Sequence, residues 1–469
     1  MISLWVTAEN IHHQFYGTKA RHQIVGNTNS IGSIFQIVPR LYDGFQVKKI
    51  YQDKVKKEDT NLAIIRAANK SIWNWKDIKR QCDWCLDNHI KPVIDDCWEV
   101  GDPFSRLYET RFGKTQKDYL VKNNIKIIAQ IPPIHHKFKW DNKIDTCFQF
   151  DTDDIFINFD NFFYLTRYQH QTFNNNFKMR TYPTFYKNKK YLFTALMGDI
   201  LKHRNTALLG HLYYNNLIDE NCFYSSILNK NVNYDADIPE KWKDEITQWC
   251  ERTGEDRNNW DDFQDDTTIE VENYVNENKE KIFKHKSFDD NYKNIEPDAP
   301  ILPCQGAKGS DPLFSLDEEV IEIPDNSMIS ERRIPQELYD SHFAINVETM
   351  DHPFFFTEKT FKHIIAKVPF ITYGGSYFSK GLKEHHGFER FEEIFDYSYE
   401  DEIPKNTRCG KYIKGIVDNV KRLKKEPVSI FSQPSVREKL DYNEYIYFKM
   451  TTDIEVQKAV EKLFYEVLE

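Results

Sequence analysis

The sequence lacks any long hydrophobic run, since no apolar stretch approaches the roughly 18 residues that a membrane-spanning helix needs. We therefore expect no membrane span. The first residues, MISLWVTAENIHH, carry neither a basic segment nor a long apolar core, so they predict a first strand rather than a signal peptide. Together these absences favour a cytoplasmic location.

A zinc-ribbon spacing of cysteines is also missing. The eight cysteines are scattered, and Cys82 and Cys85 form a lone C-x-x-C pair inside the helical pattern WKDIKRQCDWCLDNHI. A redox or metal role would need a second pair or a thioredoxin-like context. We expect two half-buried helix cysteines in a protein that is kept reduced inside the cell.

A surplus of basic residues is absent as well. The sequence has 63 lysines and arginines against 73 acids, which gives a net charge of −10. This balance argues against a protein that grips nucleic acid mainly through phosphate contacts, although a local basic groove is compatible with it. The motifs GxxxxGK[ST], GxSxG and HExxH do not occur either. The sequence therefore predicts no P-loop, no serine-hydrolase elbow and no zinc-protease helix.

The 469 residues do contain a repeated alternation of strand and helix patterns, which is typical of α/β proteins with parallel sheets. We expect an N-terminal α/β domain over 1–189 and a second α/β domain over 190–430, interrupted by an acidic insertion at about 235–335. A helical tail over 431–469 follows and is expected to pack at the junction of the domains. The predicted strands are ISLWVT, FQVKKIY, NLAIIRA, KPVIDD and IKIIAQI in the first domain, and YLFTALMG, NCFYSSIL, HFAINVE and FITY in the second.

The stretch FFFTEKTFKHIIAKVPFITYGGSYF follows the strand HFAINVE and predicts a loop, a helix and another strand. Thr357 can cap the helix, whose N-terminus after a strand is suited to bind an anion. Lys359 adds a positive charge for a phosphate, and Glu358 can accept two hydrogen bonds from the hydroxyls of a ribose. The stretch thus predicts a site for a nucleoside diphosphate. The alternative is a solvated first-turn glutamate beside a surface lysine.

Three further residues extend this candidate site. Arg204 opens a helix just after the strand YLFTALMG, and its guanidinium is a suitable second phosphate ligand. The alternative for Arg204 is an ordinary surface position. Asn346 and Glu348 end the strand that precedes the loop before Thr357, so we include them among the candidates for binding a nucleotide sugar.

Residues 190–400 resemble the nucleotide-binding half of GT-B glycosyltransferases of the kind found in phage and marine viral genomes, and they are similar to the α-1,3-fucosyltransferases. Thr357, Glu358 and Lys359 match the TEK motif of that group, and FAINVET matches the strand before it. VPFITYGG and GFERFEEIFDYSYED match the next strand and a GF…F block, whose last part departs from the D-E-x-Y-D pattern of the family. The resemblance implies two Rossmann-like domains with a cleft between them.

The same resemblance implies a function. The chain would move a sugar from a nucleoside diphosphate donor to an acceptor hydroxyl, with inversion, without a metal and without a cofactor. Glu358 would hold the ribose, while Lys359 and Arg204 would hold the diphosphate. The acceptor would be a glycan, a protein or a modified nucleobase, and a viral protein of this type would act in the host cytoplasm. The donor sugar and the oligomeric state are not predicted.

An inverting transfer needs a general base for the acceptor hydroxyl. In a GT-B enzyme this base comes from the N-terminal domain, and KPVIDDCWEVGDP offers Asp95, Asp96 and Glu99 after a predicted buried strand. We favour Glu99 and then Asp96, with helix-capping and loop acids as the alternative interpretation. His12 and His13 follow the first predicted strand and are less favoured candidates.

Two alternatives compete with this scheme. Asp151 and Asp153, in CFQFDTDDIF, form a D-x-D motif of the kind that a metal-dependent GT-A transferase uses to bind a divalent ion and a nucleotide sugar. The other alternative is a non-catalytic nucleotide-binding or glycan-binding protein, in which the 235–335 insertion binds a partner. Metal dependence would favour the first alternative, and the lack of a competent base would favour the second.

Overall fold

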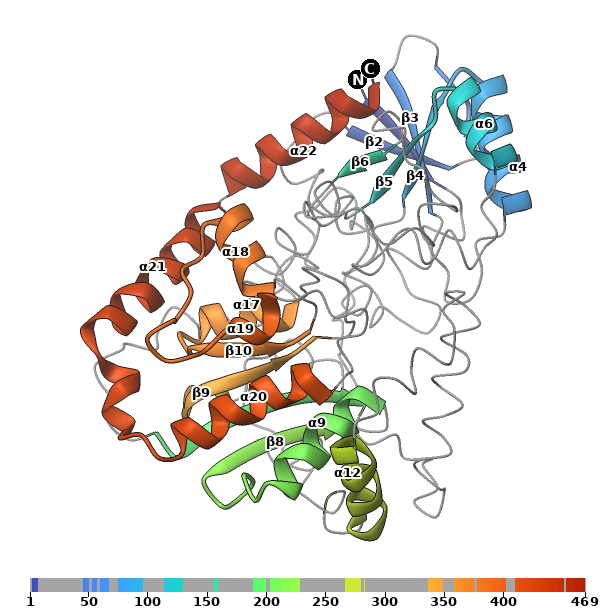
Figure 1. Cartoon of the computed structure of the whole chain (residues 1–469). Helices are drawn as coiled ribbons and strands as arrows, with labels where there is room; N and C mark the ends of the chain where they lie inside the picture. The colour runs from blue at the N-terminus through green and yellow to red at the C-terminus, as the bar shows by residue number, and fades with distance from the viewer. Residues whose placement is uncertain are drawn as a thin grey trace, which may run out of the picture.

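The described part of the chain forms two parallel β-sheets with helices packed on them (Figure 1). This confirms the α/β class that the alternating patterns predict. Among the described helices, none combines the length and the apolarity that crossing a bilayer requires. The structure, a computed structural model, describes residues 2–6, 45–49, 53–56, 60–66, 75–95, 114–129, 156–158, 189–199, 203–227, 266–279, 282, 336–348, 358–374, 378–401, 410–450 and 453–468.

The first sheet has six parallel strands in the order β2-β1-β3-β4-β5-β6. Chain order and spatial order differ at one place, because β2 lies on one side of β1 while β3 and the later strands lie on the other. Such a sheet is doubly wound. Its elements are β1 (Ile2–Val6), β2 (Phe45–Lys49), β3 (Thr60–Arg66), α4 (Trp75–Asp87), β4 (Lys91–Asp95), α6 (Lys114–Lys122), β5 (Lys126–Ala129) and β6 (Phe156–Asn158).

The core of this sheet is built around Trp5, whose indole N–H donates to Asn61 Oδ1 at 2.9 Å and whose ring lies against Trp84. Cys82 and Cys85 on α4 are free thiols that are wholly buried in this core, which is deeper than the half-buried positions that we expected. Burial raises the pKa of Cys82 to about 12 and raises that of Cys85 further. Both thiols are therefore protonated at neutral pH and contribute to packing.

The second sheet has four parallel strands in the order β10-β9-β7-β8. It is also doubly wound, since β8 lies on one side of β7 and β9 on the other. Its strands are β7 (Tyr191–Asp199), β8 (Cys222–Ile227), β9 (Ser341–Val347) and β10 (Phe370–Tyr373). The helices that follow or cover them are α9 (His203–Tyr214), α12 (Asp266–Glu277), α16 (Gln336–Tyr339), α17 (Glu358–Ile365), α18 (Phe378–His386), α19 (Ser398–Asp401) and α20 (Gly410–Leu423).

Alternate side chains of these strands point to opposite faces of the second sheet. Phe343, Ile345 and Val347 of β9 join a core cluster with α9, α12 and α20. Ala344 and Phe370 join a second cluster with α17 and α18. The helices α9 and α17 thus cover opposite faces. On α12, Tyr274 meets Tyr214 of α9 edge-on at a ring distance of 5.6 Å, and Val271 and Val275 join the same core cluster, so part of the 235–335 insertion packs on this sheet.

The C-terminal tail consists of a short 3-10 helix, η6 (Val428–Ser432), and two long helices, α21 (Pro434–Met450) and α22 (Asp453–Leu468). On one side, α21 packs against α17, where the rings of Phe361 and Tyr447 lie 5.4 Å apart. Beyond it, α22 contacts β6 of the first sheet, and Lys91 Nζ donates to the carbonyl of Leu468 at 3.3 Å. The domain boundaries and the GT-B arrangement with a cleft stay predictions.

Candidate functional site

The carboxyl edge of the second sheet, where its parallel strands end, is the place at which this topology favours a ligand. The chain leaves β7 through α9 towards β8, and it leaves the neighbouring β9 through α17 towards β10, in the opposite direction. In open doubly wound sheets, ligands bind beyond the strand ends at such a reversal of order. The favoured position therefore lies between the ends of β7 and β9.

Both helices that carry the predicted phosphate ligands begin at this edge. Arg204 is the second residue of α9, and Glu358 is the first residue of α17. The side chains of both residues lie outside the described part of the chain, as does Thr357. Because α9 and α17 cover opposite faces, a ligand shared by Arg204 and Glu358 must lie across the edge itself.

Lys359 is half-buried in the first turn of α17, and its backbone is held by a histidine one turn later. His363 is wholly buried, and its Nδ1 lies 2.7 Å from the carbonyl of Lys359. Burial lowers the pKa of His363 to about 4, so the ring is neutral at pH 7 and its Nδ1–H donates to this carbonyl. His363 thus fixes the backbone that carries Lys359.

Asn346 and Glu348 lie directly below this turn in a buried polar network. The Nδ2 of Asn346 donates to Thr360 Oγ1 at 2.9 Å, and the Thr360 hydroxyl donates to Glu348 Oε1. Weaker contacts of 3.4 Å join Asn346 Nδ2 to Glu348 Oε1 and to Thr372 Oγ1. Asn346 and Thr360 are 0% exposed and Glu348 is 1% exposed, so all three face the protein interior.

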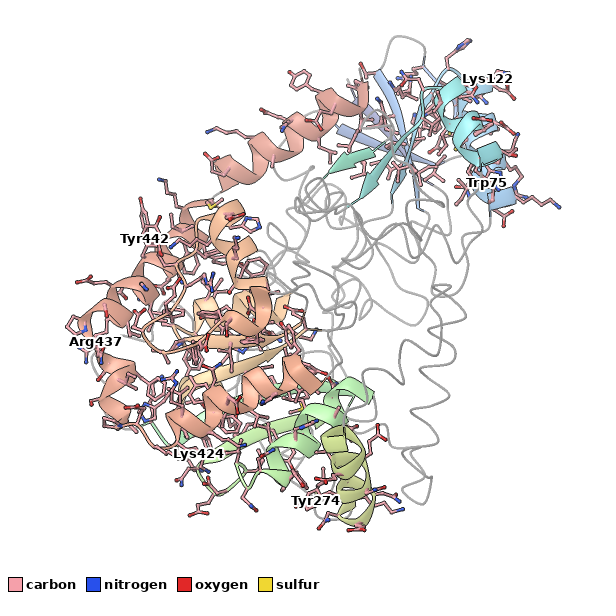
Figure 2. The ribbon with its side chains drawn as sticks, viewed as in Figure 1. Trp75, Lys122, Tyr274, Lys424, Arg437 and Tyr442 are labelled. Atoms are coloured by element: carbon pink, nitrogen blue, oxygen red, sulfur yellow. The ribbon has the colours of Figure 1, made fainter. Side chains whose placement is uncertain are left out.

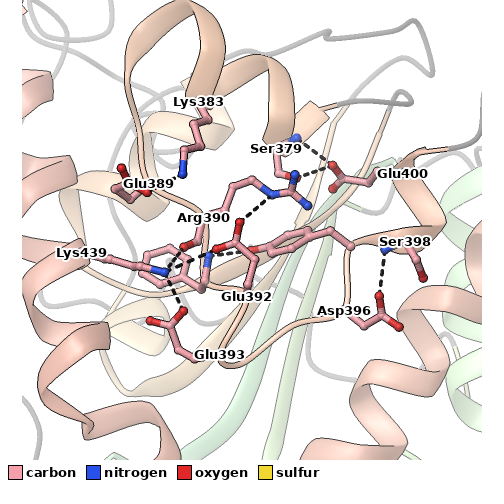
Figure 3. Close-up of polar contacts among 12 residues, drawn as sticks. Ser379, Lys383, Glu389, Arg390, Glu392, Glu393, Asp396, Ser398, Glu400 and Lys439 are labelled. Atoms are coloured by element: carbon pink, nitrogen blue, oxygen red, sulfur yellow. Dashed lines mark hydrogen bonds and ion pairs between the residues drawn. The ribbon is translucent and has the colours of Figure 1, made fainter.

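A third helix, α18, also begins at this edge, but its first turn already contacts a carboxylate of the chain (Figure 3). Glu400 accepts from the Ser379 backbone N–H at 2.8 Å and from the Ser379 hydroxyl at 2.5 Å. An anion at this helix end would compete with Glu400. The starts of α9 and α17 are therefore the better positions for a phosphate.

Of the predicted catalytic residues, the structure describes only the backbone of Asp95, at the carboxyl edge of the first sheet. Asp95 is the last residue of β4, and its side chain is outside the described part of the chain. Asp96 and Glu99 follow it and are outside the described residues, as are His12 and His13. The base therefore stays a prediction.

Asp151 and Asp153 are also outside the described residues. The nearest described strand, β6, begins after them at Phe156. The metal-dependent interpretation expects a strand that leads into the D-x-D motif, and no such strand is among the described elements. Nor do the described residues contain a group of three or more His, Cys, Asp or Glu side chains that could hold a metal ion.

Sequence reasoning missed Thr360 and Glu400. A signal for Thr360 was present, because it shares the helical stripe of Ile364 and Val368 and is thus a polar residue on the buried face of α17. For Glu400, within DYSYED, the pattern gave no comparable signal.

The chain matches no protein-family model and no curated protein sequence. The fold and the edge geometry therefore define the class, which is that of doubly wound parallel α/β proteins.

Proposed function

We propose that the chain is a GT-B glycosyltransferase that binds a nucleoside diphosphate sugar at the carboxyl edge of the second sheet. The observation that carries the proposal is topological. The neighbouring strands β7 and β9 send their helices in opposite directions, and the first turns of these helices hold Arg204, Glu358 and Lys359. Two cations and a carboxylate at one strand edge suit a diphosphate and a ribose.

The reaction would be an inverting displacement. The acceptor oxygen attacks the anomeric carbon while a base from the 95–99 segment removes its proton, and the bond from that carbon to the diphosphate oxygen breaks. The leaving diphosphate keeps the electron pair of that bond, and Arg204 and Lys359 stabilise its charge. Two fixed cations can perform this task without a metal ion, so metal independence belongs to the proposal.

The proposal is tested by nucleotide binding. A panel of nucleoside diphosphates and their sugars is screened for an increase in melting temperature, since a ligand at 100 times its dissociation constant adds about 2.7 kcal/mol to the stability of the folded state. The dissociation constant of the best ligand is then measured by calorimetry. If none of the nucleotides binds, the proposal is wrong.

Lys359→Ala is the decisive variant. We expect it to weaken binding of the nucleoside diphosphate by about 1–3 kcal/mol, because a charge-assisted contact is lost. Lys122→Ala is the matched control, since Lys122 is exposed on the last turn of α6 (Figure 2), on the other sheet. Equal affinities for wild type, Lys359→Ala and Lys122→Ala would contradict the assignment of Lys359.

A further inference from the structure

Thr360 lies in the first turn of α17, directly after Lys359, and its hydroxyl contacts residues at the end of β9. We propose that Thr360 is a positioning residue: its hydroxyl joins the Glu348 carboxylate to the Asn346 amide and so fixes the first turn of α17 in the orientation that presents Lys359 to the donor diphosphate. The inference rests on the proposed function and extends it to a residue with no contact to the ligand.

The direction of the hydrogen bonds in this network is determined by chemistry. The Nδ2 of an asparagine can only donate, so at 2.9 Å the Thr360 oxygen must accept from Asn346. The single hydrogen of the Thr360 hydroxyl is then directed to Glu348 Oε1. Removal of this one hydroxyl breaks both bonds. One of them is the shortest hydrogen bond of the buried Asn346 amide.

The network has little freedom to rearrange, because it is enclosed. A Cβ atom added to Gly374 would lie 3.3 Å from Glu348 Cβ and 2.9 Å from Thr372 Cγ2, so the chain after β10 passes close over the Glu348 side chain. Buried polar groups that lose a partner in such surroundings are costly. The hydroxyl of Thr360 therefore selects one position for the first turn of α17.

The location of the network connects it to ligand binding. Thr360 directly follows Lys359, and Asn346 and Glu348 stand at the end of β9, beside the reversal of strand order. With His363 bonded to the Lys359 carbonyl, this backbone is held from two directions. A protein group that is already held in its binding position loses less entropy when the ligand binds. A looser first turn should thus weaken binding without removing any charge.

The sequence-based hypothesis that Asn346 and Glu348 touch the nucleotide sugar themselves predicts something different. Under that hypothesis, Thr360→Val leaves both side chains in place and changes affinity little. Under the positioning hypothesis, Thr360→Val weakens nucleotide binding, because valine has nearly the same shape as threonine but no hydroxyl. Thr360→Ser restores the hydroxyl and should rescue binding.

Thr194→Val is the matched control. Thr194 is also wholly buried on the second sheet, but its hydroxyl bonds to the Glu337 carbonyl at 3.0 Å and to Ser341, where β9 begins. The same chemical change is thus made on β7, at a hydroxyl that contacts the first residue of β9. It should lower the melting temperature and leave nucleotide affinity unchanged.

The experiment measures the dissociation constant of the best nucleoside diphosphate, the melting temperature and the amide hydrogen exchange of residues 358–366. We expect Thr360→Val to weaken binding about 5- to 30-fold and to speed exchange in this segment. Thr360→Ser should stay within about 3-fold of wild type. Wild-type affinity in Thr360→Val, or an equal loss in Thr194→Val, would overturn the proposal.

Failure of the proposed function gives a different result. If wild type binds no nucleoside diphosphate, the donor site is wrong, and hydrogen exchange alone decides the positioning role. Faster exchange of 358–366 in Thr360→Val but not in Thr194→Val supports that role. Equal exchange in both variants overturns it.

Discussion

Glu400 is a carboxylic acid with almost no contact with solvent, at 1% exposure. Burial raises its pKa from 4.5 to about 7, although the hydrogen bonds from Ser379 and Tyr399 and the nearby charge of Arg390 favour the ionised form. The group thus titrates near neutral pH. Its ionisation state is coupled to the start of α18, because the same carboxylate bonds to Ser379.

We expect Glu400→Gln to change the pH dependence of stability. The folded-state pKa of Glu400 is raised, so its contribution to stability is present below pH 4.5 and is lost as the pH rises to about 7. Relative to Glu400→Gln, wild type should therefore lose roughly 3 kcal/mol of unfolding free energy across this window. Denaturant titrations of both proteins between pH 4 and 8 measure the difference.

An exposed glutamate provides the control variant for this comparison. Glu426 lies in the turn after α20, and Glu426→Gln, measured over the same pH range, controls for the loss of a surface carboxylate. A Glu400→Gln curve that runs parallel to wild type would show that Glu400 does not titrate in the folded state near neutral pH.

Four of the described helices end in the same way, shortly before a strand. Each ends with a residue in the left-handed conformation, followed by a buried apolar residue whose N–H bonds to the carbonyl five positions earlier, as in a Schellman motif. The φ angles of the left-handed residues are 50–58°. The pairs are His89–Ile90 after α4, Asn124–Ile125 after α6, Asn216–Leu217 after α9 and Lys367–Val368 after α17.

Two of these left-handed residues should respond oppositely to glycine. His89 is exposed, so His89→Gly relieves the left-handed strain and should raise the unfolding free energy by about 0.5–1 kcal/mol. Lys367 is 7% exposed at its side chain and pairs with Asp441 at 2.8 Å and with Glu444 at 2.5 Å on α21. Lys367→Gly should lower the unfolding free energy by about 1–3 kcal/mol, because it removes both of these ion pairs.

Thermal and denaturant unfolding of the two variants test this contrast. Equal stabilisation by both substitutions would mean that the ion pairs of Lys367 with α21 contribute nothing measurable to the unfolding free energy. Destabilisation by His89→Gly would show that the entropy cost of glycine exceeds the strain in α4.

At the scale of the whole molecule, the tail helices join the two sheets through contacts on both. The helix α21 packs on α17, and α22 contacts β6. A base on the first sheet and a donor on the second could then work together only if their two edges meet around one substrate. This arrangement is part of the proposed function, and kinetics can test it.

We expect Glu99→Gln to lower the rate of sugar transfer by roughly 10²–10⁴, because the variant keeps its shape and loses the base. Donor affinity should be nearly unchanged, since the donor would bind on the other sheet. Initial rates with the best donor, measured with and without a strong chelator, provide the check. Transfer should survive the chelator.

Other outcomes of these assays would move the assignment. Normal turnover in Glu99→Gln together with an inactive Asp96→Asn would give the role to Asp96. Activity in both variants would exclude this segment and direct attention to His12 and His13. Turnover abolished by the chelator and by Asp151→Asn would favour the metal-dependent alternative.

The sequence by itself determined the strands and helices with strong local patterns. The predicted strands were found as β1 to β5 and β7 to β10, and the terminal amphipathic helix was found as α22. The three-residue β6 was missed because a strand so short has no recognisable period. The sequence also placed Glu358 and Lys359 at a helix start after a strand, because capping and periodicity depend on neighbours within about one turn.

The tertiary structure alone decided which distant groups meet. Thr360 lies 12 residues from Glu348, and Ser379 lies 21 residues from Glu400, yet each pair shares a hydrogen bond. The order β10-β9-β7-β8, which makes β7 and β9 neighbours at the reversal, likewise cannot be read from any single segment. The physical reason is that burial and side-chain pairing depend on how separate elements pack, whereas local patterns record only which face of each element is apolar.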